Sequence, residues 1–177
     1  MKKVVLVYGL LAGFLIIVLG IILQMSLGEH SMITGYATMV VSLLMVFFGI
    51  KSYRDQHNGG VITFGRAFRV GILIALIASV FYVVGWEIYS SLYMPNFMED
   101  YSAKYLEEMK AEGASAAKIS ETMAEMETWK EIYKNPVYRV GMVFMEIFPV
   151  GLLVTLISAA VLRRKDDTLS GAKPVVA

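Results

Sequence analysis

The sequence predicts an all-α, polytopic membrane protein with four transmembrane helices and a helical hairpin outside the membrane. Three observations support this fold class. Hydrophobic residues make up 57% of the 177 residues, and the mean hydropathy is +0.63. Charged residues make up 18%, against about 25% in soluble domains. Four apolar runs also reach the roughly 20 residues that a helix needs to cross a bilayer. This composition argues against an ordinary soluble enzyme.

The first two apolar runs, residues 4–27 and 32–50, contain no charged residue. Only residues 28–31 separate them, so we expect a tight helical hairpin. The basic start of the first run resembles a signal peptide, but signal sequences have an apolar region of only about 7–15 residues. We therefore interpret the first run as a span of the mature protein.

The third and fourth runs, residues 70–94 and 140–162, each contain one ionisable residue, Glu87 and Glu146. A carboxyl group inside a membrane is costly and is a functional hypothesis by default. Both glutamates lie toward one end of their spans, which favours a structural or interfacial role. The alternative is a paired carboxylate site for a proton or a cation.

Two further residues affect the surroundings of Glu146. Arg139 lies two turns before Glu146 on nearly the same helical face, so we expect it to partner Glu146 indirectly. Pro149 removes a backbone donor and would free the carbonyl group of Met145 beside this glutamate.

The charges between the spans predict the orientation, because cytoplasmic loops retain Lys and Arg. With the N-terminus inside, the inner segments hold ten basic and three acidic residues, and the outer segments hold six basic and ten acidic residues. We therefore predict that both termini are cytoplasmic. The formal net charge of +1 is too small to predict binding to nucleic acid.

The inner loop between the second and third spans contains a turn signal and a helix start. Asn58-Gly59-Gly60 is typical of a turn, and Thr63 is suited to be the N-cap of the helix that follows. Arg66 and Arg69 share one face of this helix. We expect them to contact the membrane surface and its anionic lipids; an anionic ligand or partner is the alternative.

The outer segment, residues 95–136, is too long to be a structureless connection. Apolar residues recur in it at three- and four-residue spacing, which predicts two helices. Gly113 is expected to end the first helix, Ser115 to begin the second, and Asn135-Pro136 to end it. The two stripes consist of Met98, Tyr101, Tyr105 and Met109, and of Ile119, Met123, Met126, Trp129 and Ile132 or Tyr133.

Seven of the twelve methionines lie between Met94 and Met145, and thioethers are soft ligands that suit Cu(I). The outer methionines share their stripes with Tyr, Ile and Trp, however, so helix packing explains them better. We predict no metal site and no cofactor.

Small residues predict where helices pack closely, because lipid gives no hydrophobic drive for helix association. They recur at four-residue spacing in three spans, and packing within one chain is favoured over packing between copies. The rows are Gly9 and Gly13; Gly71, Ala75 and Ser79; and Gly151, Thr155 and Ala159.

Several of these motifs together resemble a bacterial membrane-protein family known as domain of unknown function, family forty-one ninety-nine. The resemblance covers residues 4–165, and it implies no activity, ligand or catalytic residue. We expect one transmembrane domain over residues 1–165 and a disordered cytoplasmic tail over residues 166–177. The motifs are the run from Gly59 to Gly71, Gly113-Ala-Ser-Ala, Tyr133-Lys-Asn135-Pro136, Glu146-x-x-Pro149-Val-Gly151, Ser158-Ala and Arg163-Arg164-Lys165.

The sequence favours a non-enzymatic interaction, assembly or regulatory component of the cell inner membrane. Its partners are expected to be the lipid bilayer and, through the outer hairpin, a second copy of the chain or another membrane protein. A small transporter or channel subunit that uses Glu87 and Glu146 is the alternative. We expect no enzymatic activity, because Gly59-Gly60 lacks the downstream Lys of a phosphate-binding loop and no nucleophile–base pair is recognisable.

Overall fold

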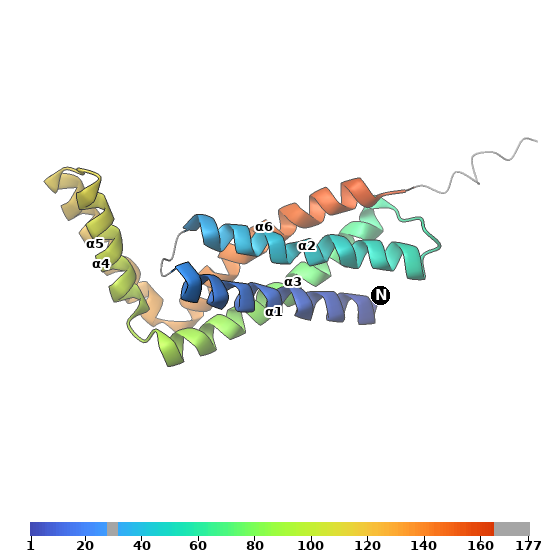
Figure 1. Cartoon of the computed structure of the whole chain (residues 1–177), viewed down its shortest axis with the longest axis horizontal. Coiled ribbons are helices and arrows are strands. Elements are labelled where there is room, and N and C mark those ends of the chain that lie inside the picture. The colour runs from blue at the N-terminus through green and yellow to red at the C-terminus, as the bar shows by residue number, and fades with distance from the viewer. Residues whose placement is uncertain (28–31, 165–177) are drawn as a thin grey trace, which may run out of the picture. The chain divides into compact units, whose positions relative to one another are not determined.

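The computed structural model describes residues 1–27 and 32–164, and within them the chain forms six helices and no strand. In chain order these are α1 (Lys2–Leu27), α2 (Met32–His57), α3 (Phe64–Tyr93), α4 (Phe97–Ala111), α5 (Ala116–Lys134) and α6 (Pro136–Leu162) (Figure 1). The all-helical fold class is confirmed. The predicted turn at residues 28–31 and the predicted tail at 166–177 lie outside the described residues.

The helices divide the chain into two compact units, where the sequence predicted one domain over residues 1–165. Unit 1 comprises residues 1–82 and the chain from residue 146 onward, and unit 2 comprises residues 83–145. Unit 1 therefore holds α1, α2, most of α3 and most of α6. Unit 2 holds the end of α3, the hairpin α4–α5 and the start of α6.

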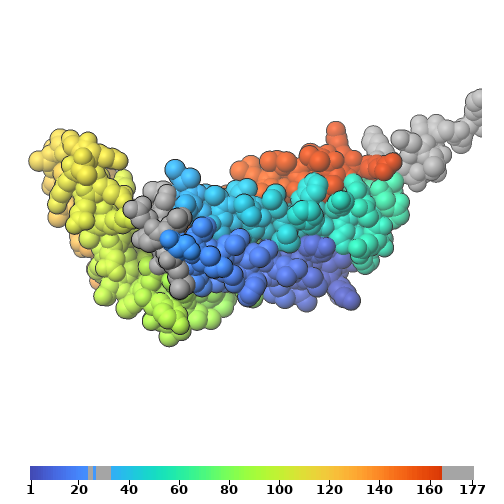
Figure 2. Space-filling view, viewed as in Figure 1, coloured from blue at the N-terminus to red at the C-terminus, as the bar shows by residue number. Residues whose placement is uncertain are grey.

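Unit 1 is an apolar bundle in which α1 and α2 lie side by side along their length (Figure 2). Its core consists of branched and small side chains with almost no exposed surface, including Leu43, Ile50 and Ile74. α2 ends at His57, seven residues beyond the predicted end of the second span. α3 begins at Phe64, six residues before the predicted start of the third span. The added turns carry the charges of the inner loop, which a helix end in water tolerates.

Each predicted helix boundary of the outer segment is found. The Ser115 hydroxyl accepts a hydrogen bond from the amide of Lys118 (3.3 Å) at the start of α5. α4 ends at Ala111, and Gly113 follows it with φ +80°, a conformation that favours glycine. α5 ends at Lys134, and Pro136 is the first residue of α6, where its missing N–H costs nothing.

The contact between α4 and α5 differs from the predicted stripes in one respect. The buried positions are two small polar residues, Ser102 and Thr122, whereas Met123 and Trp129 are about half exposed. The Ser102 hydroxyl donates to the carbonyl oxygen of Met98 (2.6 Å), so it needs no partner on α5. Small side chains at the centre let two helices approach, and the bulky ones then lie on the flanks.

Candidate functional site

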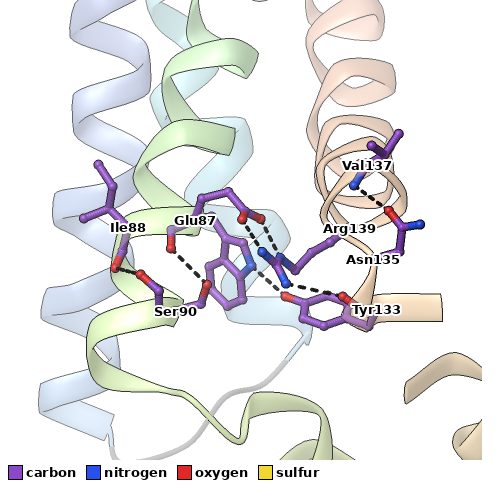
Figure 3. Close-up of polar contacts among 9 residues, drawn as sticks. Glu87, Ile88, Ser90, Tyr133, Asn135, Val137 and Arg139 are labelled. Carbon is purple, nitrogen blue, oxygen red and sulfur yellow. Dashed lines mark hydrogen bonds and ion pairs between the residues drawn. The ribbon is translucent and has the colours of Figure 1, made fainter. Parts of the chain in front are cut away.

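The most elaborate group of polar contacts in unit 2 joins the end of α3 to the start of α6. The guanidinium of Arg139 donates to both carboxylate oxygens of Glu87, from Nε (2.8 Å) and from Nη2 (2.6 Å). Figure 3 shows the two side chains facing each other, with Tyr133 beside them. Two parallel bonds of this kind fix the orientation of both groups and are stronger than bonds between neutral groups.

Tyr133 provides a second set of contacts to the same arginine. The guanidinium carbon of Arg139 lies 5.5 Å from the centre of the Tyr133 ring, and Nη1 donates to the Tyr133 carbonyl oxygen (3.4 Å). The Tyr133 hydroxyl accepts a hydrogen bond from the Trp86 indole (2.9 Å). Tyr133 thus connects the last turn of α5 with both α3 and α6.

Aromatic packing completes this arrangement, which we name the junction and define as Trp86, Glu87, Phe97, Tyr133 and Arg139. The ring of Phe97, the first residue of α4, lies edge-on to Trp86 at 5.0 Å and at 5.8 Å from Tyr133. Such aromatic contacts add about 0.5–1.5 kcal/mol each beyond the burial of area. Both ends of the hairpin α4–α5 are therefore held by one cluster.

The local sequence explains why these groups meet. Asn135 ends α5 in an extended conformation, and its side-chain oxygen accepts from the amide of Val137 in the first turn of α6. One helix ends and the next begins at this one residue, so Tyr133 and Arg139 lie on either side of the turn. Glu87 lies within two turns of the end of α3 and reaches them from there.

The structure changes the prediction for Arg139, which pairs with Glu87 rather than indirectly with Glu146. Seven residues along a helix correspond to a rise of about 10.5 Å, too far for contact between Arg139 and Glu146. Glu146 itself is exposed and belongs to unit 1, as does Pro149, which lies inside α6. Glu87 and Glu146 therefore belong to different units.

Sequence reasoning missed the pairing of Glu87 with Arg139, and it also missed Trp86 and Phe97. A signal for the pair was present. Glu87 lies six residues before the end of α3, and Arg139 lies three residues after the start of α6, so opposite charges occur near neighbouring ends of two apolar helices. The separation of 52 positions hides this match from any local pattern.

In unit 1 the small residues lie where helices come closest. A Cβ on Gly9 would lie 2.7 Å from Cβ of Ile77, and one on Gly13 would lie 2.7 Å from Cβ of Phe81. α1 thus packs against α3 through the row that begins at Gly9. Gly49 on α2 is a further contact point, which the sequence did not indicate: a Cβ there would lie 2.5 Å from Cδ1 of Ile74.

The rows on α3 and α6 face each other. A Cβ on Gly71 would lie 2.7 Å from Cγ2 of Thr155, and one on Gly151 would lie 3.0 Å from Cβ of Ala75. Ser79 and Ala159 in the same rows are fully buried. The Ser79 hydroxyl donates to the Ala75 carbonyl (2.8 Å), whereas the buried hydroxyl oxygen of Thr155 has no hydrogen-bond partner among the residues that the structure describes.

The two loop arginines are exposed and lie at the start of α3. Thr63 caps this helix as predicted, because its hydroxyl accepts from the amide of Arg66 (3.4 Å). The Arg66 guanidinium donates to the side-chain oxygen of Asn58 (2.7 Å), and Arg69 lies one turn further on.

The length and composition of the helices define the class of protein. Within residues 1–27 and 32–164, four helices are long and apolar enough to cross a membrane, over Lys2–Leu23, Ile33–His57, Phe64–Tyr93 and Pro136–Leu162. Large apolar side chains on them are exposed, such as Phe14 on α1 (54%) and Val161 on α6 (67%). The chain is a multi-pass helical membrane protein.

The family follows from a match to a family model. Residues 7–164 match the family described as protein of unknown function (DUF4199), and the chain belongs to this family. The match confirms the resemblance seen in the sequence motifs. No match was found among curated proteins or among solved structures.

Proposed function

We propose that this protein is a non-enzymatic interaction, assembly or regulatory component of the cell inner membrane. Both termini lie in the cytoplasm, and the hairpin α4–α5 lies outside and contacts a second copy of the chain or another membrane protein. The alternating directions of four spans and the excess of basic residues in the inner segments support this orientation.

The observation that carries the proposal is the junction. A hairpin held at both ends by an ion pair, an indole–phenol hydrogen bond and edge-on and tilted aromatic rings is ordered before any partner arrives. Preorganisation of this kind lowers the entropy cost of binding. A hairpin that served only to connect two spans would not need such contacts.

The exposed side chains of the hairpin suit a contact surface. Tyr101, Met123 and Trp129 are 37%, 51% and 46% exposed, and aromatic residues and Met are enriched at protein interfaces. The hairpin also carries nine acidic and five basic residues. A partner surface of net positive charge would complement it.

Orientation is directly testable because the chain has no cysteine. A single Ser120→Cys on the hairpin and a single Gln56→Cys at the end of α2 each give one exposed thiol. In intact cells a membrane-impermeant maleimide is expected to label Ser120→Cys and to label Gln56→Cys only after lysis. The reverse pattern would overturn the orientation.

Partner contact is tested by photo-crosslinking in native membranes. A photoreactive residue at Trp129 or Met123 is expected to give one discrete adduct, whose mass distinguishes a second copy from another protein. The same residue at Glu107, an exposed acidic position on α4, is the matched control. Absence of any adduct from Trp129 and Met123 would count against the proposal.

A transporter or channel subunit is the second candidate, and the observation that favours it is Glu146. This carboxyl group is exposed on an apolar helix inside a candidate span, and such groups mark ion or proton pathways. Glu87 already has a structural partner in Arg139. Glu146→Gln is expected to abolish a proton- or cation-dependent flux in liposomes, and an unchanged flux would exclude this candidate.

A further inference from the structure

In unit 1 the loop between α2 and α3 meets the end of α6 (Figure 1). Basic residues occur at the end of α2, at the start of α3 and just after α6. The backbones of Ile62 and Arg164 form a two-way bridge, with the Ile62 amide donating to the Arg164 carbonyl (3.0 Å) and the Arg164 amide donating to the Ile62 carbonyl (2.9 Å). This pairing joins positions 102 residues apart and fixes where the C-terminal end of α6 lies.

Further bonds hold the same loop in one conformation. The amide of Gly60 donates to the carbonyl of Arg54 (3.0 Å), and the Asn58 side chain donates to the Val61 carbonyl and accepts from Arg66. Arg54 itself donates to the Leu162 carbonyl (3.4 Å). The end of α2, the loop and the end of α6 therefore form one connected structure.

The charge of this structure is strongly positive. Six basic residues lie in these segments and in the adjoining first turns of α3, namely Lys51, Arg54, Arg66, Arg69, Arg163 and Arg164. Among the described residues of the same segments, the acidic one is Asp55, and it is already bound to Arg54 (2.6 Å). Four exposed arginines make no ion pair within residues 1–27 and 32–164. These four are Arg66, Arg69, Arg163 and Arg164.

We infer that Arg66 and Arg69 on α3, together with Arg163 and Arg164 after α6, bind the phosphate headgroup of one anionic phospholipid. Guanidinium groups bind phosphate oxygens in pairs, and basic sites between helices on the cytoplasmic side take anionic lipid headgroups. The inference goes beyond the proposed function but rests on its membrane placement.

Apolar surface next to these arginines explains why the ligand is a lipid rather than free phosphate. Ile157 and Val161 are 63% and 67% exposed and lie one turn apart on α6, in the two turns that precede Arg164. Acyl chains can lie along these side chains while the headgroup stays at the arginines.

The test uses the full-length protein in detergent and native mass spectrometry, with phosphatidylglycerol or phosphatidylcholine added. One saturable phosphatidylglycerol per chain is expected, with weaker binding of phosphatidylcholine. The double variant Arg66→Gln with Arg69→Gln should lower the affinity for phosphatidylglycerol at least about tenfold, since each basic residue contributes about fivefold to the affinity. Arg163→Gln with Arg164→Gln should do the same and leaves the backbone bridge intact.

Lys2→Gln with Lys3→Gln is the matched control, because it removes the same charge near the same end of unit 1 outside the loop structure. An equal loss in this control, or equal binding of the two lipids, would overturn the site. The last measurement is competition between inorganic phosphate and the bound lipid. If phosphate displaces the lipid at comparable concentration, the site is one for free phosphate and the lipid assignment is wrong.

Asn58→Ala separates a built site from diffuse attraction, because it changes no charge but releases Arg66. This variant should lower the affinity for phosphatidylglycerol by a few fold, and an unchanged affinity would contradict the site. Binding in detergent does not depend on orientation or on a hairpin partner. Failure of this inference is therefore distinguishable from failure of the proposed function.

Discussion

The contacts that stabilise unit 1 internally differ in kind from those that stabilise unit 2. Helices of unit 1 meet through glycine, alanine and fully buried aliphatic side chains. Ser42 and Thr155 carry buried hydroxyl oxygens that have no hydrogen-bond partner in the described part of the chain. Unit 2 is held by directed contacts, the Glu87–Arg139 ion pair and the rings around Tyr133.

The difference follows from the solvent that each set of helices is built for. In lipid, apolar side chains gain nothing by leaving the bilayer for a helix interface, so close fit has to supply the attraction. Near the ends of spans, water is available and charged or aromatic side chains are tolerated. Unit 1 should therefore respond to changes of shape, and unit 2 to changes of chemistry.

Gly71→Leu should have the largest effect on stability, because a side chain there would overlap Thr155 and Ile50, with Cβ 2.7 and 2.8 Å from their side chains. Overpacking of this kind costs about 3 kcal/mol. We expect a lower midpoint of unfolding for the purified protein in detergent micelles. Gly20→Leu is the matched control, since a Cβ at Gly20 meets no described atom within 4 Å. Equal losses in both variants would show that close fit does not govern unit 1.

Arg139→Ala should have the next largest effect, since it leaves the Glu87 carboxylate without its partner. The side chains of Glu87 and Arg139 are 24% and 25% exposed, so we expect a loss of about 2 kcal/mol, below the 3–5 kcal/mol of a fully buried pair. Faster proteolysis of the hairpin should accompany it. Combining it with Glu87→Gln should add little further loss; fully additive losses would mean that the pair does not act as a unit.

The sequence predicts local features of both units well. Helix ends depend on a few neighbouring residues, so Thr63, Ser115 and Asn135-Pro136 were predictable as boundaries. The spacing of Gly71, Ala75 and Ser79 likewise indicates a packing face without any partner being known.

Contacts between distant segments could not be read in this way. The pairing of Arg139 with Glu87 depends on how far α3 and α6 each extend, and the bridge between Ile62 and Arg164 depends on where α6 ends. Ser102 and Thr122 are buried because two helices approach there, although neither residue is apolar. A pattern within one helix contains none of this information.

Thr155→Val should stabilise unit 1, in contrast to the first two changes. Its buried hydroxyl oxygen has no hydrogen-bond partner within residues 1–27 and 32–164, and an unsatisfied buried polar group costs about 1–3 kcal/mol. We expect a gain of about 1 kcal/mol in the same unfolding assay. Ser79→Ala is the comparison, because the Ser79 hydroxyl donates to Ala75 and its removal should give no gain. A loss of stability in Thr155→Val would mean that a group outside the chain binds this hydroxyl.

Lys118→Gln on α5 should have the smallest effect. The hydrogen bond from Lys118 to Glu121 (2.9 Å) raises the pKa of Lys118 above its usual 10.5, but both side chains are more than half exposed. Because the folded pKa is the higher one, any stabilisation is complete below about pH 10.5 and is lost as the pH rises through the folded pKa. Solvent screens such a pair, so unfolding curves of Lys118→Gln and the unchanged protein should coincide at pH 7. A clear loss at pH 7 would show that unit 2 depends on its exposed charges as well as on the junction, and would remove the reason for treating Arg139 as its main electrostatic contact.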